Sequence, residues 1–418
     1  MNITVLTAIG DPRREAELAA GLHDTDLGVT VVRRCVDIAD LLAAGSAGLA
    51  QAVLLSADLR RLDRTAVQRL VDAGLAVVAL APDDVAARDR LRRLGITTVI
   101  GESAPAAGVA AAVVAAVSGH GEPDLPVPVY PQGPVVASAE LIAVWGPAGA
   151  PGRSSVAVNL AAELAVLGQP TLVVDLDTYG PALAQLVGLL DDGSGVAAAC
   201  RAANSGSLDA ATLRRLAVEV RPRLRMLTGI TNPSRWPELR PASVEVLLER
   251  AKQTFRFVVV DAGFCVEQDE ELSYDTVAPR RNGATVDVLA AADVVVAVAA
   301  ADPIGIARFV RAVVDLPRPA PAAAPVTVIN RVRRAAVGRG EPAQQIALAL
   351  GRYADIEDAV MVPDDPNTAD AAVASGRTWS EVAPASPARL ALRGLARRLA
   401  GDTTAQVRPR RRLLQIRA

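Results

Sequence analysis

Short apolar runs alternate with segments of helical periodicity along the first 118 residues. The runs have the length of buried strands and occupy residues 3–6, 29–32, 52–55, 76–80 and 97–100. Between and after them, apolar residues recur at helical spacing at 13–22, 38–44, 64–73, 85–94 and 106–117. Strands that alternate with helices predict a parallel sheet with helices on both faces, so we expect a flavodoxin-like α/β domain over residues 1–118.

A second alternating region follows a break in this pattern. Residues 119–138 are rich in proline and glycine and have no apolar period, which predicts an extended linker. The alternation resumes over residues 139–400, with strands expected at 141–145, 171–174, 257–260 and 326–329. We expect a larger, doubly wound and mostly parallel sheet there, followed by a basic tail at 401–418.

Composition narrows the class of protein. Apolar residues make up 51% of the chain and aromatic residues only 3%, so the core must consist of alanine, valine and leucine. The net charge of −2 argues against binding of polyanions over the whole surface. The distant Cys35, Cys200 and Cys265 indicate a reducing compartment, and the isolated His23 and His120 argue against a zinc site. Because the N-terminus lacks a signal-peptide pattern, we expect a cytoplasmic protein.

A loop rich in glycine and proline links the strand expected at 141–145 to a predicted helix. A strand, such a loop and a helix form the arrangement in which backbone amides and a helix N-terminus bind phosphate. The phosphate-loop pattern G-x-x-x-x-G-K-[ST] is met only at Gly152 and Ser154, because Arg153 occupies the lysine position and Pro147 that of the first glycine. The motif alone is therefore weak evidence for a nucleotide site.

Polar residues follow the other predicted strands, at the end where parallel strands present a binding edge, and a proline lies further along the chain. They are Asp175, Asp177, Asp261, Asn330, Arg331 and Pro363. Each one taken alone has a structural interpretation, since an acidic residue at a strand end often caps a helix. Their order along the chain is what favours a nucleotide site.

These landmarks together resemble the deviant Walker ATPases of the MinD/ParA family, whose loop K-G-G-x-G-K-[ST]-[ST] lines up with residues 148–155. The resemblance implies ATP or ADP with Mg²⁺ as cofactors and a homodimer. It assigns nucleotide binding to Gly149, Ala150, Gly152, Arg153, Ser154, Ser155, Asn330, Arg331 and Pro363. It also implies that the Ser154 hydroxyl and, through water, Asp261 hold Mg²⁺, and that Asp175 and Asp177 are catalytic candidates.

Departures from the family pattern bear on hydrolysis. Arg153 keeps the charge of the family's inner lysine but presents a wider, planar donor. Ala148 stands where the family has a lysine that reaches the partner's phosphates, and Lys252, the only lysine, lies elsewhere. Pro151 lacks an amide hydrogen. We expect nucleotide binding with weak or absent hydrolysis, since loss of a cation acting across a dimer typically costs about 10³–10⁵ in rate.

The first domain resembles a response-regulator receiver domain in size and element order only. Receiver chemistry needs acidic residues after the first strand, an aspartate at the end of the third and a lysine after the fifth. Here Ala8 and Ile9 follow the first strand, the third ends at Ser56, and Gly101 and Glu102 follow the fifth. We therefore do not expect phosphotransfer, and an interaction or oligomerisation module and a purely structural domain are both open.

A receiver-like domain followed by a MinD/ParA-like domain resembles the CpaE-type localisation proteins of Flp/tight-adherence pilus systems and related septum-site-determining proteins of actinobacteria. The resemblance implies an ATP-binding spatial organiser that places a pilus or secretion ATPase, or a division component. A nucleotide-insensitive scaffold is the first alternative. A ParA-type partition ATPase on DNA is the second, which the net charge of −2 disfavours.

Two further segments have open interpretations. The segment 267–275 is strongly acidic and forms either a nucleotide-sensing switch or a solvated loop. The basic tail is either solvated or in peripheral contact with the inner face of a membrane, and Pro409 interrupts any amphipathic helix there.

Overall fold

The computed structural model describes residues 2–24, 27–119, 140–149, 151–189, 193–267, 280–316, 320, 325–334 and 340–401. Ala150, most of the acidic segment, nearly all of the linker and nearly all of the basic tail lie outside these ranges. The chain divides into two compact units. Unit 1 comprises Met1–Val135, Ala197–Leu213 and Pro237–Arg250, and unit 2 comprises Val136–Val196, Arg214–Trp236 and Ala251–Ala418.

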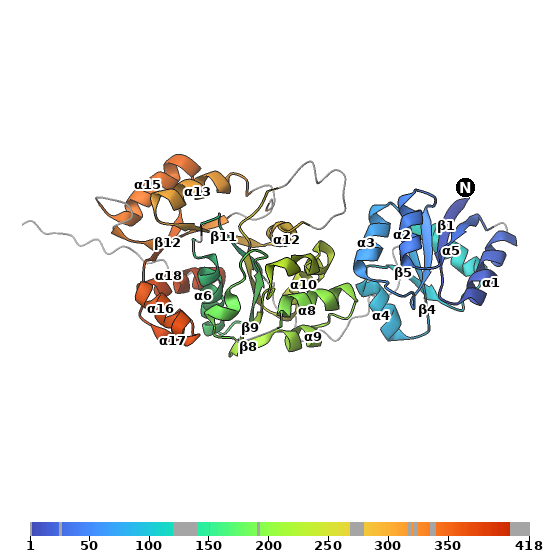
Figure 1. Ribbon diagram of the computed structural model, residues 1–418, viewed down its shortest axis with the longest axis horizontal. Coiled ribbons are helices and arrows are strands. Elements are labelled where there is room, and N and C mark those ends of the chain that lie inside the picture. Colours follow the sequence, from blue (N-terminus) through green and yellow to red (C-terminus); the bar gives the residue numbers. More distant parts are fainter. Residues whose placement is uncertain are drawn as a thin grey trace, which may run out of the picture. The chain divides into compact units, whose positions relative to one another are not determined.

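The first sheet, as far as the structure describes it, has five strands in the order β2-β1-β3-β4-β5 (Figure 1). They are β1 (Ile3–Ala8), β2 (Val29–Arg34), β3 (Ala52–Ser56), β4 (Ala76–Ala81) and β5 (Thr98–Gly101). All neighbouring strands pair in parallel. Each strand coincides with a predicted apolar run, so the parallel α/β architecture is confirmed.

Helices cover both faces of this sheet. They are α1 (Pro12–Asp24), α2 (Ile38–Ser46), α3 (Arg64–Asp72), α4 (Val85–Arg93) and α5 (Ala106–Val117). Leu18 of α1 and Val113 of α5 share one apolar cluster. Leu41, Leu70 and Leu91, from α2, α3 and α4, share the other. Burial on both faces explains why the strands are apolar throughout rather than alternating with polar residues.

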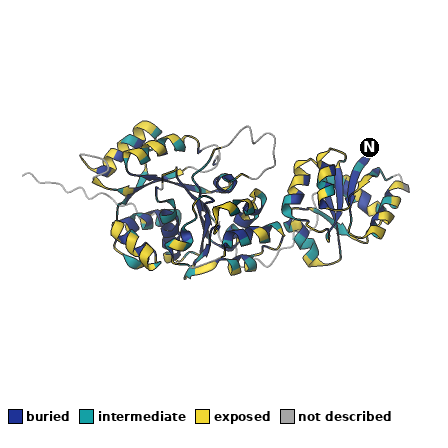
Figure 2. Ribbon diagram, in the orientation of Figure 1, coloured by how far each residue is buried: buried dark blue, intermediate teal, exposed yellow. Residues whose placement is uncertain are grey.

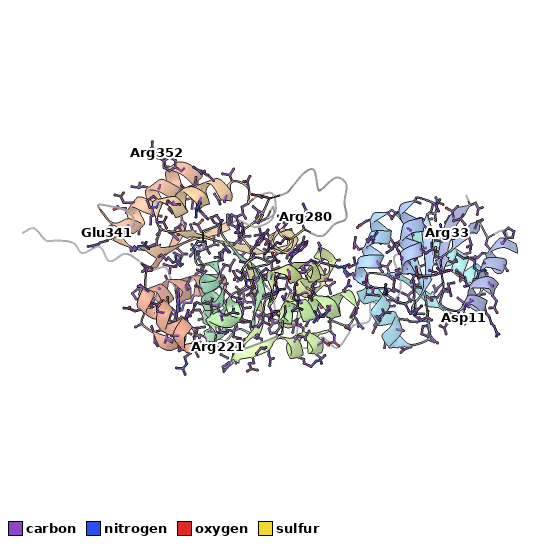
Figure 3. The ribbon with its side chains drawn as sticks, viewed as in Figure 1. Asp11, Arg33, Arg221, Arg280, Glu341 and Arg352 are labelled. Atoms are coloured by element: carbon purple, nitrogen blue, oxygen red, sulfur yellow. The ribbon has the colours of Figure 1, made fainter. Side chains whose placement is uncertain are left out.

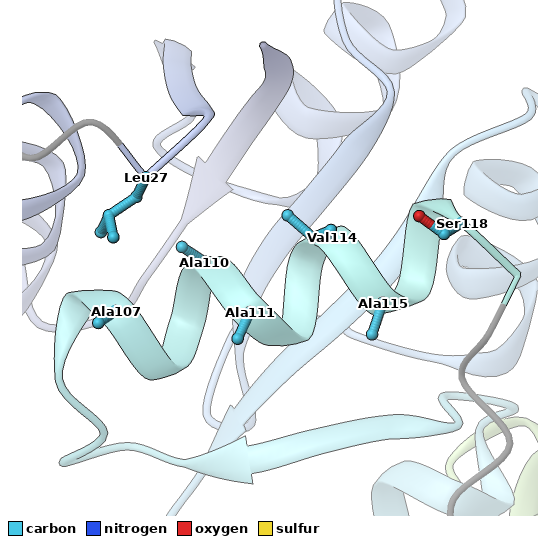
Figure 4. A pocket seen from close by; sticks show the side chains of 7 residues that line it. All are labelled: Leu27, Ala107, Ala110, Ala111, Val114, Ala115 and Ser118. Carbon is cyan, nitrogen blue, oxygen red and sulfur yellow. The ribbon is translucent and has the colours of Figure 1, made fainter. Parts of the chain in front are cut away.

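An open apolar hollow of about 470 Å³ lies along α5 (Figure 4). Leu27, the α5 positions Ala107, Ala111 and Val114, and Ser118 just after α5 are among the residues that line it. None of the described residues that line it carries a charge.

The second sheet has eight strands among the described residues, in the order β13-β12-β11-β6-β10-β7-β9-β8. They are β6 (Glu140–Trp145), β7 (Thr171–Leu176), β8 (Val218–Arg221), β9 (Leu224–Leu227), β10 (Phe257–Ala262), β11 (Val294–Ala300), β12 (Pro325–Val332) and β13 (Ala359–Pro363). The β8–β9 pair is antiparallel and the other pairs are parallel. The doubly wound, mostly parallel sheet is therefore confirmed, whereas β8, β9, β11 and β13 were not individually predicted.

Helices also follow the strands of this second sheet. They are α6 (Arg153–Val166), α7 (Leu183–Leu186), α8 (Gly195–Asn204), α9 (Ala210–Leu216), α10 (Pro241–Thr254), α12 (Gly283–Ala291), α13 (Pro303–Val313), α15 (Pro342–Ala354), α16 (Pro366–Ser375), α17 (Trp379–Val382), α18 (Pro387–Leu399) and the 3₁₀ helix η1 (Pro233–Glu238). Every residue of α6 from Val156 to Ala165 is buried, which makes it a core helix (Figure 2).

The core helix α6 is anchored by polar contacts with the C-terminal part of unit 2. Arg389 of α18 donates from Nε to the Glu163 carboxylate at 2.7 Å, and both side chains are buried. The Asn159 side chain accepts the backbone amide of Trp379 at 2.8 Å and donates to the carbonyl of Ser155. These contacts fix the helix whose first turn ends the phosphate loop.

Charged side chains lie mainly on the outside of the molecule. Glu341 and Arg352, near the two ends of α15, are exposed and extend away from the ribbon in Figure 3. Among the residues that the structure describes, no helix has both the length and the apolar character needed to cross a bilayer.

Candidate functional site

The phosphate loop lies at the edge formed by the carboxyl ends of the parallel strands. Residues 146–152 leave β6, and α6 begins at Arg153 with Gly152 as its N-cap. Gly149 and Gly152 have φ values of 108° and 95°, in the left-handed region that favours glycine. Gly152 has no side chain with which to cap the first turn of α6, and no side-chain cap is formed there among the described residues, so its amides suit an anionic acceptor.

Arg153 folds back over its own loop. Its Nη1 donates to the carbonyl oxygens of Gly146 at 3.2 Å and Pro147 at 3.3 Å, and its Nη2 donates to the Asp177 carboxylate at 3.1 Å. Its Nε is buried and has no hydrogen-bond partner among the described residues. The guanidinium is therefore committed to the loop and to one carboxylate, with one donor left unsatisfied.

Asp175 is a buried carboxylate that holds the segment after β7. It accepts the backbone amides of Ala182 and Leu183, both at 3.0 Å, and that of Asp177 at 3.3 Å. Burial raises the pKa of Asp175 to about 7, although the amide donors oppose that rise. These contacts give Asp175 a positioning role in the apo fold, while its predicted catalytic role stays a prediction.

Asp261 has no such partners. Its side chain lies one residue before the end of β10 with 0% exposure, and neither carboxylate oxygen accepts a hydrogen bond of ordinary geometry from a described residue, although the Ser154 hydroxyl lies close to it. Burial, and next the nearby Asp175, raise the pKa of Asp261 well above its usual value, while the Ser154 hydroxyl and the Arg153 guanidinium oppose that shift. A buried carboxylate without such donors is costly in its charged form, and either a proton or a bound cation relieves that cost.

Asp177 links the phosphate loop to the segment that follows β7. Besides Arg153, its carboxylate accepts the amides of Tyr179 at 2.9 Å and Gly180 at 3.2 Å. Arg281 stacks over the Tyr179 ring, with Cζ 4.2 Å from the ring centroid. The position of Arg153 is thus coupled to a segment that also contacts residues beyond β10.

Asn330 lies within β12 and contacts the phosphate loop. Its side-chain amide donates to the carbonyl of Pro151 at 2.9 Å, and a Cβ on Gly152 would overlap Nδ2 of Asn330. Arg331 has a φ of 60° and is exposed. Pro363 ends β13, paired with Val332 of β12. The structure therefore brings Asn330 to the loop, and the nucleotide binding predicted for these three residues stays a prediction.

Two residues at this edge were not predicted. Thr285 of α12 is fully buried, and its hydroxyl has no partner among the described residues. A Cβ on Gly263 would lie 2.8 Å from that hydroxyl and 3.5 Å from Oδ1 of Asp177. Arg308 of α13 lies against Gly149. Neither residue follows a motif, so only the packing of their helices reveals them.

The residues present fit a magnesium-bound nucleotide. Mg²⁺ takes oxygen ligands and is usually held by one or two carboxylates together with water and phosphate. Asp261 and the nearby Ser154 supply such oxygens, and no cluster of three metal-binding side chains occurs in the described part of the chain. The uncapped amides of α6 and the Nε of Arg153 are donors suited to the phosphate.

Solved structures share the fold of the larger sheet. A ParA family ATPase from Chlorobium tepidum TLS aligns at a TM-score of 0.51 and 18% identity, over 62% of this chain and 99% of that one. The septum site-determining protein MinD of Pyrococcus horikoshii OT3, complexed with Mg-ADP, aligns at 0.48 and 17%, over 65% and 99%. A chain of the MinC:MinD cell division complex of Aquifex aeolicus aligns at 0.49 and 19%, over 65% and 99%.

Other comparisons give no match. No protein-family model matches the chain. No curated protein matches it either. At 18% identity, the likeness to the ParA family ATPase establishes the α/β fold of that ATPase in this chain.

Proposed function

We propose that residues 146–155 bind ATP or ADP together with Mg²⁺, and that hydrolysis is weak or absent. The observation that carries this proposal is a complementary pair of unsatisfied groups at one sheet edge. Among the described residues, both carboxylate oxygens of Asp261 are buried acceptors without a hydrogen bond of ordinary geometry, and Nε of Arg153 is a buried donor without an acceptor. A phosphate with a bound cation satisfies both groups, because the cation pairs with Asp261 and the phosphate accepts from Arg153 Nε. An apolar or neutral ligand does not do both.

The roles of the individual residues follow from their positions. Gly149, Gly152 and the first turn of α6, including Ser154 and Ser155, present amides to the phosphates. Ala150 belongs to the same proposal and lies outside the described residues. Asp261 and the Ser154 hydroxyl hold Mg²⁺, which neutralises phosphate charge when it is bound.

Weak hydrolysis follows from the contacts of Arg153. The guanidinium donates to two loop carbonyls and to Asp177, so Asp177 is not available to orient a water. Ala148 supplies no cation at the exposed side of the loop. A site with these features binds nucleotide and releases it without efficient phosphoryl transfer.

We further propose a cellular role as a nucleotide-dependent spatial organiser of CpaE type, acting on a pilus or secretion ATPase or on a division component. The order of the loop and carboxylate landmarks and the ParA-type fold support this role. The proposal includes a homodimer, an interaction role for the receiver-like domain, and peripheral membrane contact through the basic tail. Dimerisation measured by light scattering with and without Mg·ATP tests it, and an unchanged mass would argue against switching.

The binding proposal is tested by calorimetric titration of the full chain with Mg·ATP and Mg·ADP. We expect binding that Asp261→Asn weakens about 100-fold, because the magnesium ligand is lost. Asp58→Asn is the matched control, since Asp58 also lies beyond a parallel strand but is exposed and hydrogen-bonded to Ser56. Equal effects of the two substitutions would count against a site at Asp261.

A nucleotide-insensitive scaffold is the second candidate function. The observation that favours it is internal satisfaction of the loop, through the Arg153–Asp177 pair and the hydrogen bond from Asn330 to Pro151. If millimolar Mg·ATP and Mg·ADP produce neither heat nor a thermal shift in the wild-type chain, this candidate replaces the first.

A further inference from the structure

Helix α13 is held firmly beside the phosphate loop. It follows β11, which pairs with β6, the strand that leads into the loop. The Asp302 side chain caps its first turn by accepting the Gly305 amide at 2.9 Å, and Phe309 is fully buried. A Cβ on Gly305 would lie 2.6 Å from the carbonyl oxygen of Ala300, so the helix sits tightly on its strand. The positions of its side chains are thereby fixed.

Arg308 of this helix reaches the loop. A Cβ on Gly149 would overlap Nη1 of Arg308 and would lie 3.4 Å from its Cζ and 3.7 Å from its Cδ. The distal side chain therefore runs along the loop at Gly149, where any larger residue would collide with it. Gly149 and its neighbour Ala148 are both exposed, so the guanidinium lies on the solvent side of the loop.

The guanidinium groups of Arg308 and Arg153 have different surroundings. Arg153 is paired with Asp177 at 3.1 Å and is mostly buried. Arg308 is exposed, and it forms no ion pair or side-chain hydrogen bond with any residue that the structure describes. The loop thus has one arginine already engaged and a second one available to an anion.

We infer that Arg308 binds a phosphate of the nucleotide held by the loop and makes the site prefer a nucleoside triphosphate to a diphosphate. This inference rests on the proposed nucleotide site and adds a residue and a specificity to it. A guanidinium donates to phosphate oxygens in a charge-assisted, two-pronged geometry. The triphosphate carries more negative charge, so it gains more from a second cation than the diphosphate does.

The test is calorimetric titration of the full-length wild type, Arg308→Ala, Arg308→Lys and Arg311→Ala with Mg·ATP, Mg·ADP and inorganic tripolyphosphate. We expect Arg308→Ala to weaken Mg·ATP binding about 10- to 100-fold and Mg·ADP binding less, so that the ATP-to-ADP preference falls. Arg308→Lys keeps the charge and retains part of the preference. Arg311, exposed on the same helix, is the matched control, and Arg311→Ala should bind as the wild type does.

The outcomes distinguish the inference about Arg308 from the proposed nucleotide binding on which it rests. If the wild type binds nucleotide and Arg308→Ala has the same ratio of Mg·ATP to Mg·ADP affinity, the inference about Arg308 is wrong while the proposed nucleotide site stands. If the wild type binds neither nucleotide, the proposed function fails. In that case, tripolyphosphate binding that Arg308→Ala weakens supports Arg308 as a polyphosphate ligand, and absence of tripolyphosphate binding overturns the inference as well. Equal melting temperatures of the variants exclude a folding defect.

Discussion

The two parallel sheets share an architecture but differ at the edge formed by the carboxyl ends of their strands. In the five-stranded sheet, Ser56 accepts the amide of Gly10 at 2.9 Å and donates to Asp58, which is exposed. In the eight-stranded sheet, Asp175 and Asp261 are buried at the corresponding edge. At the first edge Ser56 is satisfied by its neighbours, whereas at the second edge neither carboxylate oxygen of Asp261 has a hydrogen bond of ordinary geometry with a described residue.

This difference teaches that topology alone does not make a site. Both edges lie where open α/β sheets bind ligands. Only the eight-stranded sheet has at this edge a buried carboxyl group that lacks a well-formed hydrogen bond among the described residues. Such a group destabilises the fold, and this destabilisation is typical of sites at which a ligand offsets it. The same contrast extends to ion pairs, because both side chains of the Arg389–Glu163 pair are buried, whereas both side chains of the Arg33–Asp40 pair are partly exposed.

The largest effect on the free energy of unfolding is expected when one of these ion pairs is broken. Arg389→Ala leaves Glu163 charged and buried, so we expect the free energy of unfolding to fall by about 3–5 kcal/mol. Arg33→Ala is the control in the other sheet and should cost about 1 kcal/mol or less, since the Arg33 side chain is 49% exposed and that of its partner Asp40 is 22% exposed. Urea unfolding followed by circular dichroism measures both. Comparable losses would show that the two sheets do not differ in this way.

The pH dependence of stability comes next. Because the pKa of Asp175 is raised from 3.8 to about 7, the folded chain holds a proton that the unfolded chain has lost within that window. The free energy of unfolding should therefore fall as pH rises from about 4 to about 7, by at most about 1.4 kcal/mol per pH unit for one proton. Tryptophan fluorescence during urea unfolding at several pH values measures it.

Two variants sharpen this test. Asp175→Asn should reduce the slope and should not remove it, because burial also raises the pKa of Asp261. Asp58→Asn, at the other edge, should leave the slope unchanged. An unaltered slope in Asp175→Asn would assign the pH dependence to groups elsewhere.

The smallest expected effect concerns the pair that restrains Arg153. Asp177→Asn removes the negative charge that holds the guanidinium, so we expect Mg·ATP to bind up to about tenfold more tightly. Glu219→Gln, which removes an exposed pair with Arg225, is the matched control and should change nothing. Calorimetry measures both. Weaker binding in Asp177→Asn would mean that Asp177 serves the nucleotide directly and does not restrain Arg153.

Many strands, helices and site residues could be predicted from the pattern of residues that are near one another in the sequence. The five strands and the helices of the first sheet follow its apolar runs, because burial on both faces demands continuous apolar residues. Asp175, Asp177 and Asp261 were predicted at strand ends because each follows a short apolar run, and the parallel pairing of β7 with β10 brings them to one edge. The loop at Gly152 and Arg153 was predicted from the change of a strand into a helix.

Contacts between segments that are far apart in the sequence could not be predicted from such local patterns. The hydrogen bond from Asn330 to Pro151 joins residues 179 positions apart, and the Arg389–Glu163 pair joins residues 226 apart. Thr285 and Arg308 reach the site from helices whose rotation depends on packing against the sheet. No spacing rule encodes such a rotation, since it is set by the shapes of side chains on several elements at once.

The amino-acid sequence by itself thus determined the strands and helices of the first sheet, four strands of the second, and which carboxylates follow those strands, because hydrophobic periodicity and turn chemistry act over a few residues. Only the tertiary structure decided which of those carboxylates is left unpartnered, that Arg153 turns back to Asp177, and that Arg308 lies over Gly149. Those outcomes depend on burial and on the mutual placement of strands, which are properties of the folded chain as a whole.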